Sequence, residues 1–125
     1  MVHLVAEALA AVNDVPCELV LLGDVKTEPD AARAVTAAAQ NVPVFFAGVV
    51  SPNRVAIELH RADLFVSASR GESFGMAAAE AAACGTPVLA FRTGEIDRFV
   101  HHGKNGWLVP PKASDQKFAA KLQSL

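Results

Sequence analysis

The chain has 125 residues, and its 11 Lys and Arg against 13 Asp and Glu give a formal net charge of −2. Hydrophobic residues make up 52% of the chain and charged residues 19%, which excludes a disordered protein. A charge this close to neutral argues against nucleic acid or a membrane surface as a partner bound through bulk electrostatics. The length predicts one domain over residues 1–125 with a substantial core.

Membrane, secretion and metal signals are weak in this sequence. No apolar run approaches the roughly 18 residues that a transmembrane helix needs. The N-terminus carries an early carboxylate, Glu7, and no basic region, unlike a secretory signal. Cys17 and Cys84 lie far apart without metal-ligand spacing, which predicts two free thiols in a reducing compartment. These features predict a cytoplasmic protein without a transmembrane segment or a metal site.

Helix-like and strand-like segments alternate along the chain. Residues 2–13 have apolar side chains at helical spacing and predict a first helix. Short continuous apolar runs, typical of strands buried on both faces, follow at 19–22, 44–47, 64–66, 88–91 and 106–109. Further helices are predicted at 30–40, 52–62, 75–84, 95–102 and 114–125. We expect Asp30, Ser51 and Ser114 to be N-caps, and Gly85 to be a C-cap.

This order predicts an α/β fold, a Rossmann-like open parallel sheet with helices on both faces. In such sheets ligands bind beyond the carboxyl ends of the strands. The loops expected there are 23–29, 48–52, 67–74 and 92–95. The absence of Gly-x-Gly-x-x-Gly disfavours a generic dinucleotide-dependent dehydrogenase.

The segment from Ser67 to Pro87 carries the chemistry of the sequence. Glu72 precedes the predicted helix and Glu80 lies within it, about 12 Å apart along a helix axis. Two carboxylates at that distance suit two parts of one extended ligand, because ionised carboxylates accept hydrogen bonds from hydroxyl groups. Backbone N–H groups at a helix start are unpaired and suit phosphate. The combination predicts a phosphorylated sugar or a nucleotide sugar.

A family pattern of strand, Ser, Glu-x-Phe-Gly, helical Glu and Ala-x-Gly-x-Pro-Val is matched in order by Ser69, Glu72–Gly75, Glu80 and Ala83–Val88. The sequence thereby resembles the C-terminal, donor-binding domain of GT-B-fold retaining glycosyltransferases of the glycogen-synthase and sucrose-synthase type (glycosyl transferases group 1). Leu22–Asp24, Val44–Val50, Ala62–Val66 and Gly103–Pro110 extend the resemblance over nearly the whole chain.

The resemblance implies a metal-independent sugar transfer from a nucleotide diphosphate sugar, with retention of configuration and no cofactor. It implies that Glu72, the candidate catalytic residue, contacts hydroxyl groups of the donor sugar, and that Glu80 binds the ribose. The remaining donor-binding positions that it implies are Ser73, Phe74, Gly75 and Met76 at the sugar and diphosphate, Val49 and Val50 beside the nucleobase, and Gly94.

Several features depart from the family pattern. Ser73 replaces a common Pro, Glu95 replaces the second Gly of a Gly-Gly pair, and Arg98 stands where a Glu is usual. The usual first strand, which ends in Gly-Arg and is followed by a Lys, is not found. Its loss predicts that strands 19–23 and 64–67 either pair directly or face a gap. We therefore expect a domain truncated at its N-terminus, lacking the acceptor-binding domain and inactive alone.

Other functions and roles remain open at this stage. One is an incomplete or non-catalytic nucleotide-sugar-binding or interaction module without turnover. Another is half of a sugar-nucleotide epimerase, for which the expected acid–base residues are not found.

Arg70 is a candidate substitute for the missing phosphate cations, although exposed loop arginines are ordinarily solvated. We expect His3, His60, His101 and His102 to have structural roles. The phenylalanines expected in the core are Phe45, Phe46, Phe65, Phe91 and Phe99.

Overall fold

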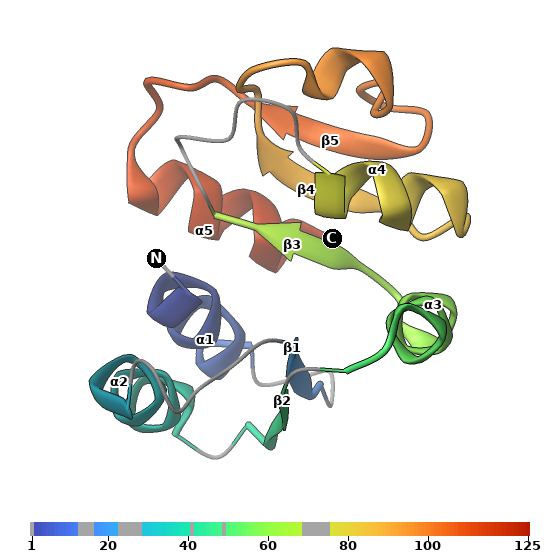
Figure 1. Cartoon of the computed structure of the whole chain (residues 1–125). Coiled ribbons are helices and arrows are strands. Elements are labelled where there is room, and N and C mark those ends of the chain that lie inside the picture. The colour runs from blue at the N-terminus through green and yellow to red at the C-terminus, as the bar shows by residue number, and fades with distance from the viewer. Residues whose placement is uncertain (1, 13–16, 23–28, 41, 49, 69–75) are drawn as a thin grey trace. The chain divides into compact units, whose positions relative to one another are not determined.

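A computed structural model describes residues 2–12, 17–22, 29–40, 42–48, 50–68 and 76–125. The protein is an α/β chain whose elements are shown in Figure 1. In order they are α1 (Val2–Ala10), β1 (Leu19–Leu22), α2 (Pro29–Ala39), β2 (Val44–Gly48), α3 (Pro52–Arg61), β3 (Phe65–Ser67), α4 (Met76–Ala83), β4 (Val88–Phe91), the 3₁₀ turn η1 (Ile96–Arg98), β5 (Gly106–Val109) and α5 (Asp115–Ser124). Two compact units divide the chain, one of residues 1–51 with 115–125 and the other of residues 52–114.

All five predicted strands are present, and a local sequence signal explains the end of helix α4. At the end of α4, the N–H of Thr86 donates to the carbonyl of Ala81 at 3.0 Å, and that of Gly85 donates to Ala82 at 3.1 Å. Gly85 has φ +79°, so it is the left-handed C-cap that the sequence predicts.

Two local predictions were wrong. α2 begins at Pro29, because proline has the φ of a first helical turn, so Asp30 lies inside the helix and its carboxylate pairs with Arg33. The helix expected at 95–102 is only the turn η1, since Val100 turns inward into the core and the following residues form a separate turn before β5.

In the first unit, β1 and β2 form a parallel pair in which Leu19 lies opposite Val44 and Val20 opposite Phe45. Helices α1 and α2 contribute Ala6, Val35 and Ala39 to a buried cluster against which Leu19, Leu21 and Val44 pack. The intervening residues Val20 and Phe45 are 39% and 52% exposed, so the prediction that Phe45 belongs to the core was wrong. The sheet pair thus has a helix-covered apolar face and an apolar face that remains partly exposed.

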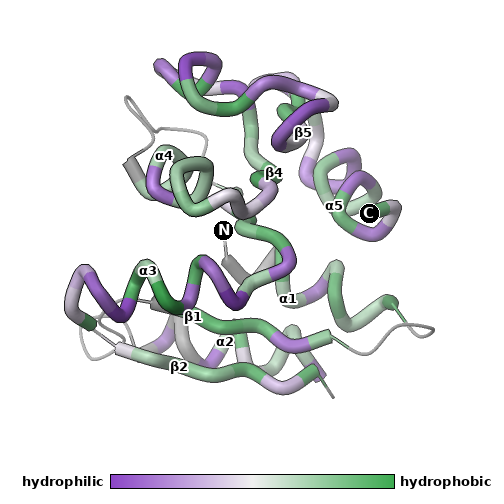
Figure 2. The backbone as a smooth tube through the Cα atoms, turned by 90° about the vertical axis from the view of Figure 1, so that its right-hand side faces the viewer, coloured by the Kyte–Doolittle hydropathy of each residue, from purple (hydrophilic) through white to green (hydrophobic). Residues whose placement is uncertain are grey.

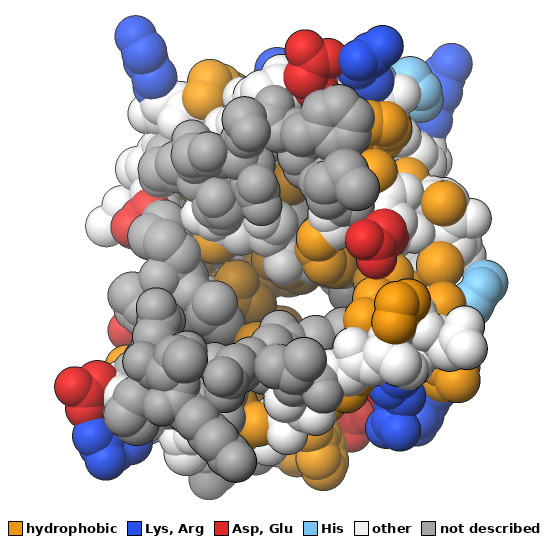
Figure 3. Space-filling view, viewed as in Figure 1, with side chains coloured by type: hydrophobic (Ala, Val, Ile, Leu, Met, Phe, Trp, Pro, Cys, Tyr) orange, Lys and Arg blue, Asp and Glu red, His pale blue; other side chains and the backbone are white. Residues whose placement is uncertain are grey.

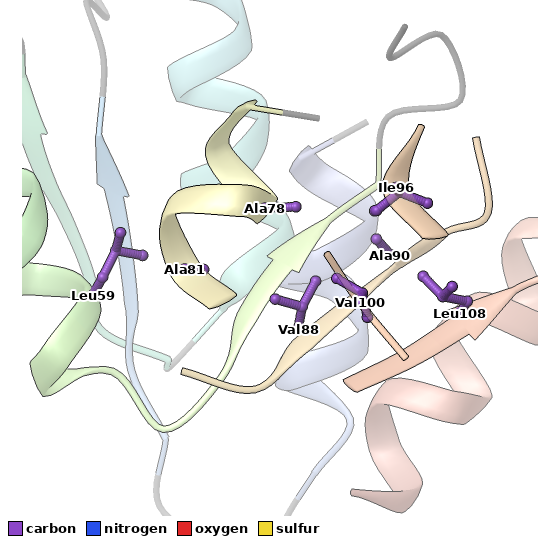
Figure 4. Packing of buried hydrophobic residues seen from close by; sticks show 8 residues of the cluster. All are labelled: Leu59, Ala78, Ala81, Val88, Ala90, Ile96, Val100 and Leu108. Atoms are coloured by element: carbon purple, nitrogen blue, oxygen red, sulfur yellow. The ribbon is translucent and has the colours of Figure 1, made fainter. Parts of the chain in front are cut away.

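In the second unit, β3, β4 and β5 form a parallel sheet with β4 in the centre. Every residue of β4 is buried. Val88 and Ala90 point toward a cluster formed with α3, α4, η1 and β5, drawn in Figure 4. Its buried members are Leu59, Ala78, Ala81, Val88, Ala90, Ile96, Val100 and Leu108.

Helix α3 illustrates how an amphipathic pattern selects the buried side. Its hydrophobic and hydrophilic residues alternate along the tube in Figure 2. Leu59 is buried and Val55 packs against the same cluster, whereas Ile57 remains 51% exposed. The spacing of four residues between Val55 and Leu59 places both on one helix face.

Strand pairing bears on the expectation that strands 19–23 and 64–67 either pair directly or face a gap. Among the described residues, β1 pairs with β2, and β3 pairs with β4, in two separate ladders. Direct pairing of β1 with β3, one of the two outcomes expected, is therefore not seen in the described part of the chain.

Candidate functional site

The carboxyl edge of the β3–β4–β5 sheet is the candidate site. Ser67, the last residue of β3, lies opposite Ala90 of β4, so the two strands end at the same edge. Helix α4 ends at Ala83, only four residues before β4 begins at Val88, and therefore runs back along the sheet. Its eight residues extend about 12 Å, close to the length of β4, so its first turn lies at the carboxyl edge.

Among the predicted site residues, the structure describes Glu80, the residue expected to bind the ribose, most fully. It lies in α4 and is exposed, while Ala78 and Ala81 of the same helix are buried against the sheet. The small alanine side chains let α4 approach the sheet closely, and the carboxylate of Glu80 remains open to solvent. This position is compatible with ligand binding.

The other predicted site residues are only partly covered by the structure. Met76 is the first residue of α4, and Val50, two positions after the end of β2 at Gly48, is half-buried. Gly94 has φ +55° and is exposed between β4 and η1. Glu72, Ser73, Phe74, Gly75 and Val49, and also Arg70, lie outside the described residues.

The loop after β4 contains four charged side chains in two ion pairs. Nη1 of Arg98 lies 3.1 Å from Oε2 of Glu95, and Nη1 of Arg92 lies 3.0 Å from Oδ1 of Asp97. Glu95 and Arg98 are the two departures from the family pattern in this loop, and they neutralise each other. The carboxylate of Glu95 is thus held by a neighbouring guanidinium, which reduces its repulsion of an anionic ligand.

A polar arrangement shapes the turn before β5. Asn105 Oδ1 accepts from the N–H of His101 at 2.6 Å, and its Nδ2 donates to the carbonyl of Phe99 at 2.8 Å. The ring Nδ1 of His102 accepts from the N–H of Leu108 at 2.9 Å. These bonds give Asn105 and His102 structural roles in the turn, as expected for His102.

Neither a metal centre nor a membrane-spanning helix is found in the part of the chain that the structure describes. No group of three or more His, Cys, Asp or Glu there is arranged to hold a metal ion. Cys17 and Cys84 are both free thiols. No helix among the described residues is long and apolar enough to span a bilayer. In Figure 3 the described Lys and Arg side chains are distributed over several parts of the face shown.

The sequence did not predict two interactions in the unit of residues 52–114. Thr86 is 4% exposed, and its Oγ1 donates to the carbonyl of Leu59 at 2.5 Å, joining the end of α3 to the start of β4. Arg92 and Asp97 are five residues apart and meet only because the chain turns through η1. A threonine before a proline and an isolated arginine carry no periodic signal that would have revealed either contact.

Comparison with known proteins gives a match over the whole chain. The sequence profile of the family described as "Glycosyl transferases group 1" matches residues 1–125. The chain is 40% identical over 89 residues to the D-inositol 3-phosphate glycosyltransferase of Acidothermus cellulolyticus, covering 70% of this chain and 20% of that protein. It is also 40% identical over 95 residues to the enzyme of the same name from Xylanimonas cellulosilytica, covering 73% of this chain and 23% of that one.

Solved structures resemble the fold over nearly its full length. Anabaena Alr3699/HepE, crystallised in complex with UDP-glucose, aligns with a TM-score of 0.78 and 26% identity, covering 98% of this chain and 34% of that one. Sucrose-phosphate synthase from Thermosynechococcus elongatus aligns with a TM-score of 0.79 and 27% identity, covering 98% and 32%. This chain therefore spans about a fifth of the curated relatives and a third of the solved structures.

Proposed function

The chain belongs to the glycosyl transferases group 1 family and has the GT-B fold, and on this premise we propose that residues 1–125 are the donor-binding domain of a glycosyltransferase. The domain binds a nucleotide diphosphate sugar, whose sugar is transferred to an acceptor held by a separate N-terminal domain. The transfer retains the anomeric configuration and requires neither a metal ion nor a cofactor. The proposed location is the cytoplasm.

The alignment with the UDP-glucose complex of Alr3699/HepE carries this proposal, because it extends over 98% of the chain. The described geometry supports it. Glu80 is exposed on α4, whose first turn lies at the carboxyl edge of the sheet, where ligands bind in parallel α/β folds. We assign Glu80 to the ribose hydroxyl groups and Glu72 to hydroxyl groups of the donor sugar, with Glu72 as the catalytic residue.

The remaining donor contacts follow the same assignment. Backbone N–H groups at the start of α4 meet the sugar and the diphosphate, where unpaired helix donors suit an anion. The residues concerned are Ser73, Phe74, Gly75 and Met76, with Gly94 nearby after β4, and with Val49 and Val50 beside the nucleobase.

Thermal unfolding in the presence of nucleotides tests donor binding. The purified chain is heated with UDP, GDP or ADP and with their sugar conjugates, because a ligand that binds only the folded state raises Tm. We expect one nucleotide to raise Tm, and Glu80→Ala to abolish the shift without changing the Tm of the unliganded chain. The matched control is Glu7→Ala, which removes an exposed helical carboxylate from α1. A cooperative transition that no nucleotide shifts would contradict donor binding.

A second candidate is a nucleotide-sugar-binding or interaction module that has no turnover of its own. Glu95 and Arg98 favour it, because these two departures from the family pattern pair with each other at 3.1 Å in the loop where donor contacts are expected. A direct assay of sugar transfer with an added acceptor-binding GT-B domain from a relative separates the two candidates, because the first candidate predicts transfer only when such a domain is supplied. Nucleotide binding without transfer supports the module, whereas turnover would exclude it.

A further inference from the structure

The carboxyl edge of the β3–β4–β5 sheet holds an arginine with access to solvent. Arg92 follows the last residue of β4, and its backbone N–H donates to the carbonyl of Val109 at 2.8 Å, which continues the ladder between β4 and β5. Its side chain is 49% exposed, and Nη1 lies 3.0 Å from Oδ1 of Asp97. The backbone of Arg92 is thus anchored at the sheet edge while its guanidinium remains reachable from outside.

The side of the sheet on which Arg92 lies follows from the strand period. Side chains two residues apart on a strand share a face, so Arg92 continues the row formed by Val88 and Ala90. That row belongs to the cluster that includes Ala78 of α4 and Ile96 of η1, as Figure 4 shows. Arg92 therefore lies on the α4 side of the sheet, at the edge where α4 begins.

We infer that Arg92 binds the diphosphate of the nucleotide donor, and that Asp97 holds the guanidinium in place until the donor replaces it. The planar guanidinium donates two parallel hydrogen bonds to phosphate oxygens, which gives charge-assisted binding with defined geometry. Asp97 is 55% exposed, and an ion pair between groups this exposed contributes little to stability. Replacing Asp97 by a diphosphate as the partner of Arg92 therefore costs little free energy. This inference rests on the proposed function, because it assumes a nucleotide diphosphate as the ligand.

Calorimetric titration of the 125-residue chain tests the inference. The titrant is whichever of UDP, GDP and ADP raises Tm most. Arg92→Gln is expected to raise the dissociation constant about tenfold. This is the loss of affinity expected when one charge-assisted contact is removed at a partly exposed site. Arg92→Lys keeps the charge without the planar fork and should recover part of that loss. Asp97→Asn removes the competing carboxylate and should tighten binding about two- to threefold.

Two control variants make the same charge changes at the opposite edge of the sheet. Arg61 ends α3 and Asp63 precedes β3, so both lie toward the amino ends of the strands, and both are exposed. Arg61→Gln and Asp63→Asn should each change the dissociation constant less than twofold, because screening in about 0.15 M salt suppresses distant exposed charges. Unchanged Tm values without ligand verify that every variant is folded.

Opposite changes of the dissociation constant in Arg92→Gln and Asp97→Asn support the inference. If the ion pair were merely structural, removing either partner would weaken binding. Equal losses in both variants, or a loss in Arg92→Gln no larger than in Arg61→Gln, would overturn it and leave the proposed function intact. A wild-type chain that binds none of the three nucleotides would overturn the inference and donor binding together.

Discussion

The strand β4 and the pair β1–β2 have similar apolar sequences but differ in burial. All four residues of β4 are at most 2% exposed, whereas Val20 of β1 and Phe45 of β2 are 39% and 52% exposed. Strand β4 has a hydrogen-bonded neighbour on each side, while β1 and β2 have only each other among the described residues. An apolar run therefore predicts a strand, but its contribution to stability depends on neighbours that the run itself does not encode. Four substitutions test this contrast.

The largest effect is expected for Phe91→Ala. Phe91 is 0% exposed at the end of β4, and truncation removes its buried surface and leaves a cavity. We expect the free energy of unfolding to fall by about 3–5 kcal/mol, measured by urea denaturation. A loss below about 1 kcal/mol would show that the site collapses around the smaller side chain and that β4 is not the rigid centre of its sheet.

The next largest effect is expected for Gly106→Ala in β5. A Cβ at this position would lie 2.4 Å from the carbonyl oxygen of Val88 and 2.8 Å from Cγ1 of Val100. Because the first of these atoms belongs to the backbone, relief requires β4 and β5 to move apart, and we expect a loss of about 2–3 kcal/mol. Thermal unfolding should show a Tm lower by roughly 10 °C. A Tm unchanged within 2–3 °C, on the order of a 0.5 kcal/mol effect, would mean that the two strands are not packed so closely.

A smaller loss is expected for Thr86→Val, which preserves shape but removes the hydroxyl donor to Leu59. The carbonyl of Leu59 also accepts the N–H of Ala62 at 3.3 Å, so it is not left unsatisfied. The expected loss of unfolding free energy is about 1 kcal/mol. Thr36→Val on the exposed side of α2 is the matched control and should change stability by less than about 0.5 kcal/mol. Equal effects in the two variants would exclude a special role for the buried hydroxyl.

The smallest effect is expected for Phe45→Ala, which makes the same chemical change as Phe91→Ala on a half-exposed side chain. Only about half of the side chain is buried, and we expect a loss of at most about 1 kcal/mol in urea denaturation. A loss approaching that of Phe91→Ala would show that Phe45 is covered in solution and would remove the contrast between the two sheets.

The candidate site shows the same division between local and tertiary information. Gly85 was predicted as a C-cap because a left-handed turn after a helix favours glycine, and its φ of +79° confirms it. The exposure of Glu80 is likewise compatible with the role that the motif implies. The pairing of Glu95 with Arg98 was not predicted, although both residues had been noted as departures. Their mutual neutralisation depends on the turn η1, where the sequence had indicated a longer helix.

The sequence by itself determined the order of helices and strands, the parallel α/β class and the family, because apolar periodicity, helix caps and the Glu72–Val88 motif are all local patterns. Only the tertiary structure decided which strands pair, which apolar residues are buried, and which distant groups meet. Thr86 reaches Leu59 across 27 residues, and Arg92 meets Asp97 around a turn. Such contacts depend on how the chain packs in three dimensions, and no spacing along the sequence specifies them.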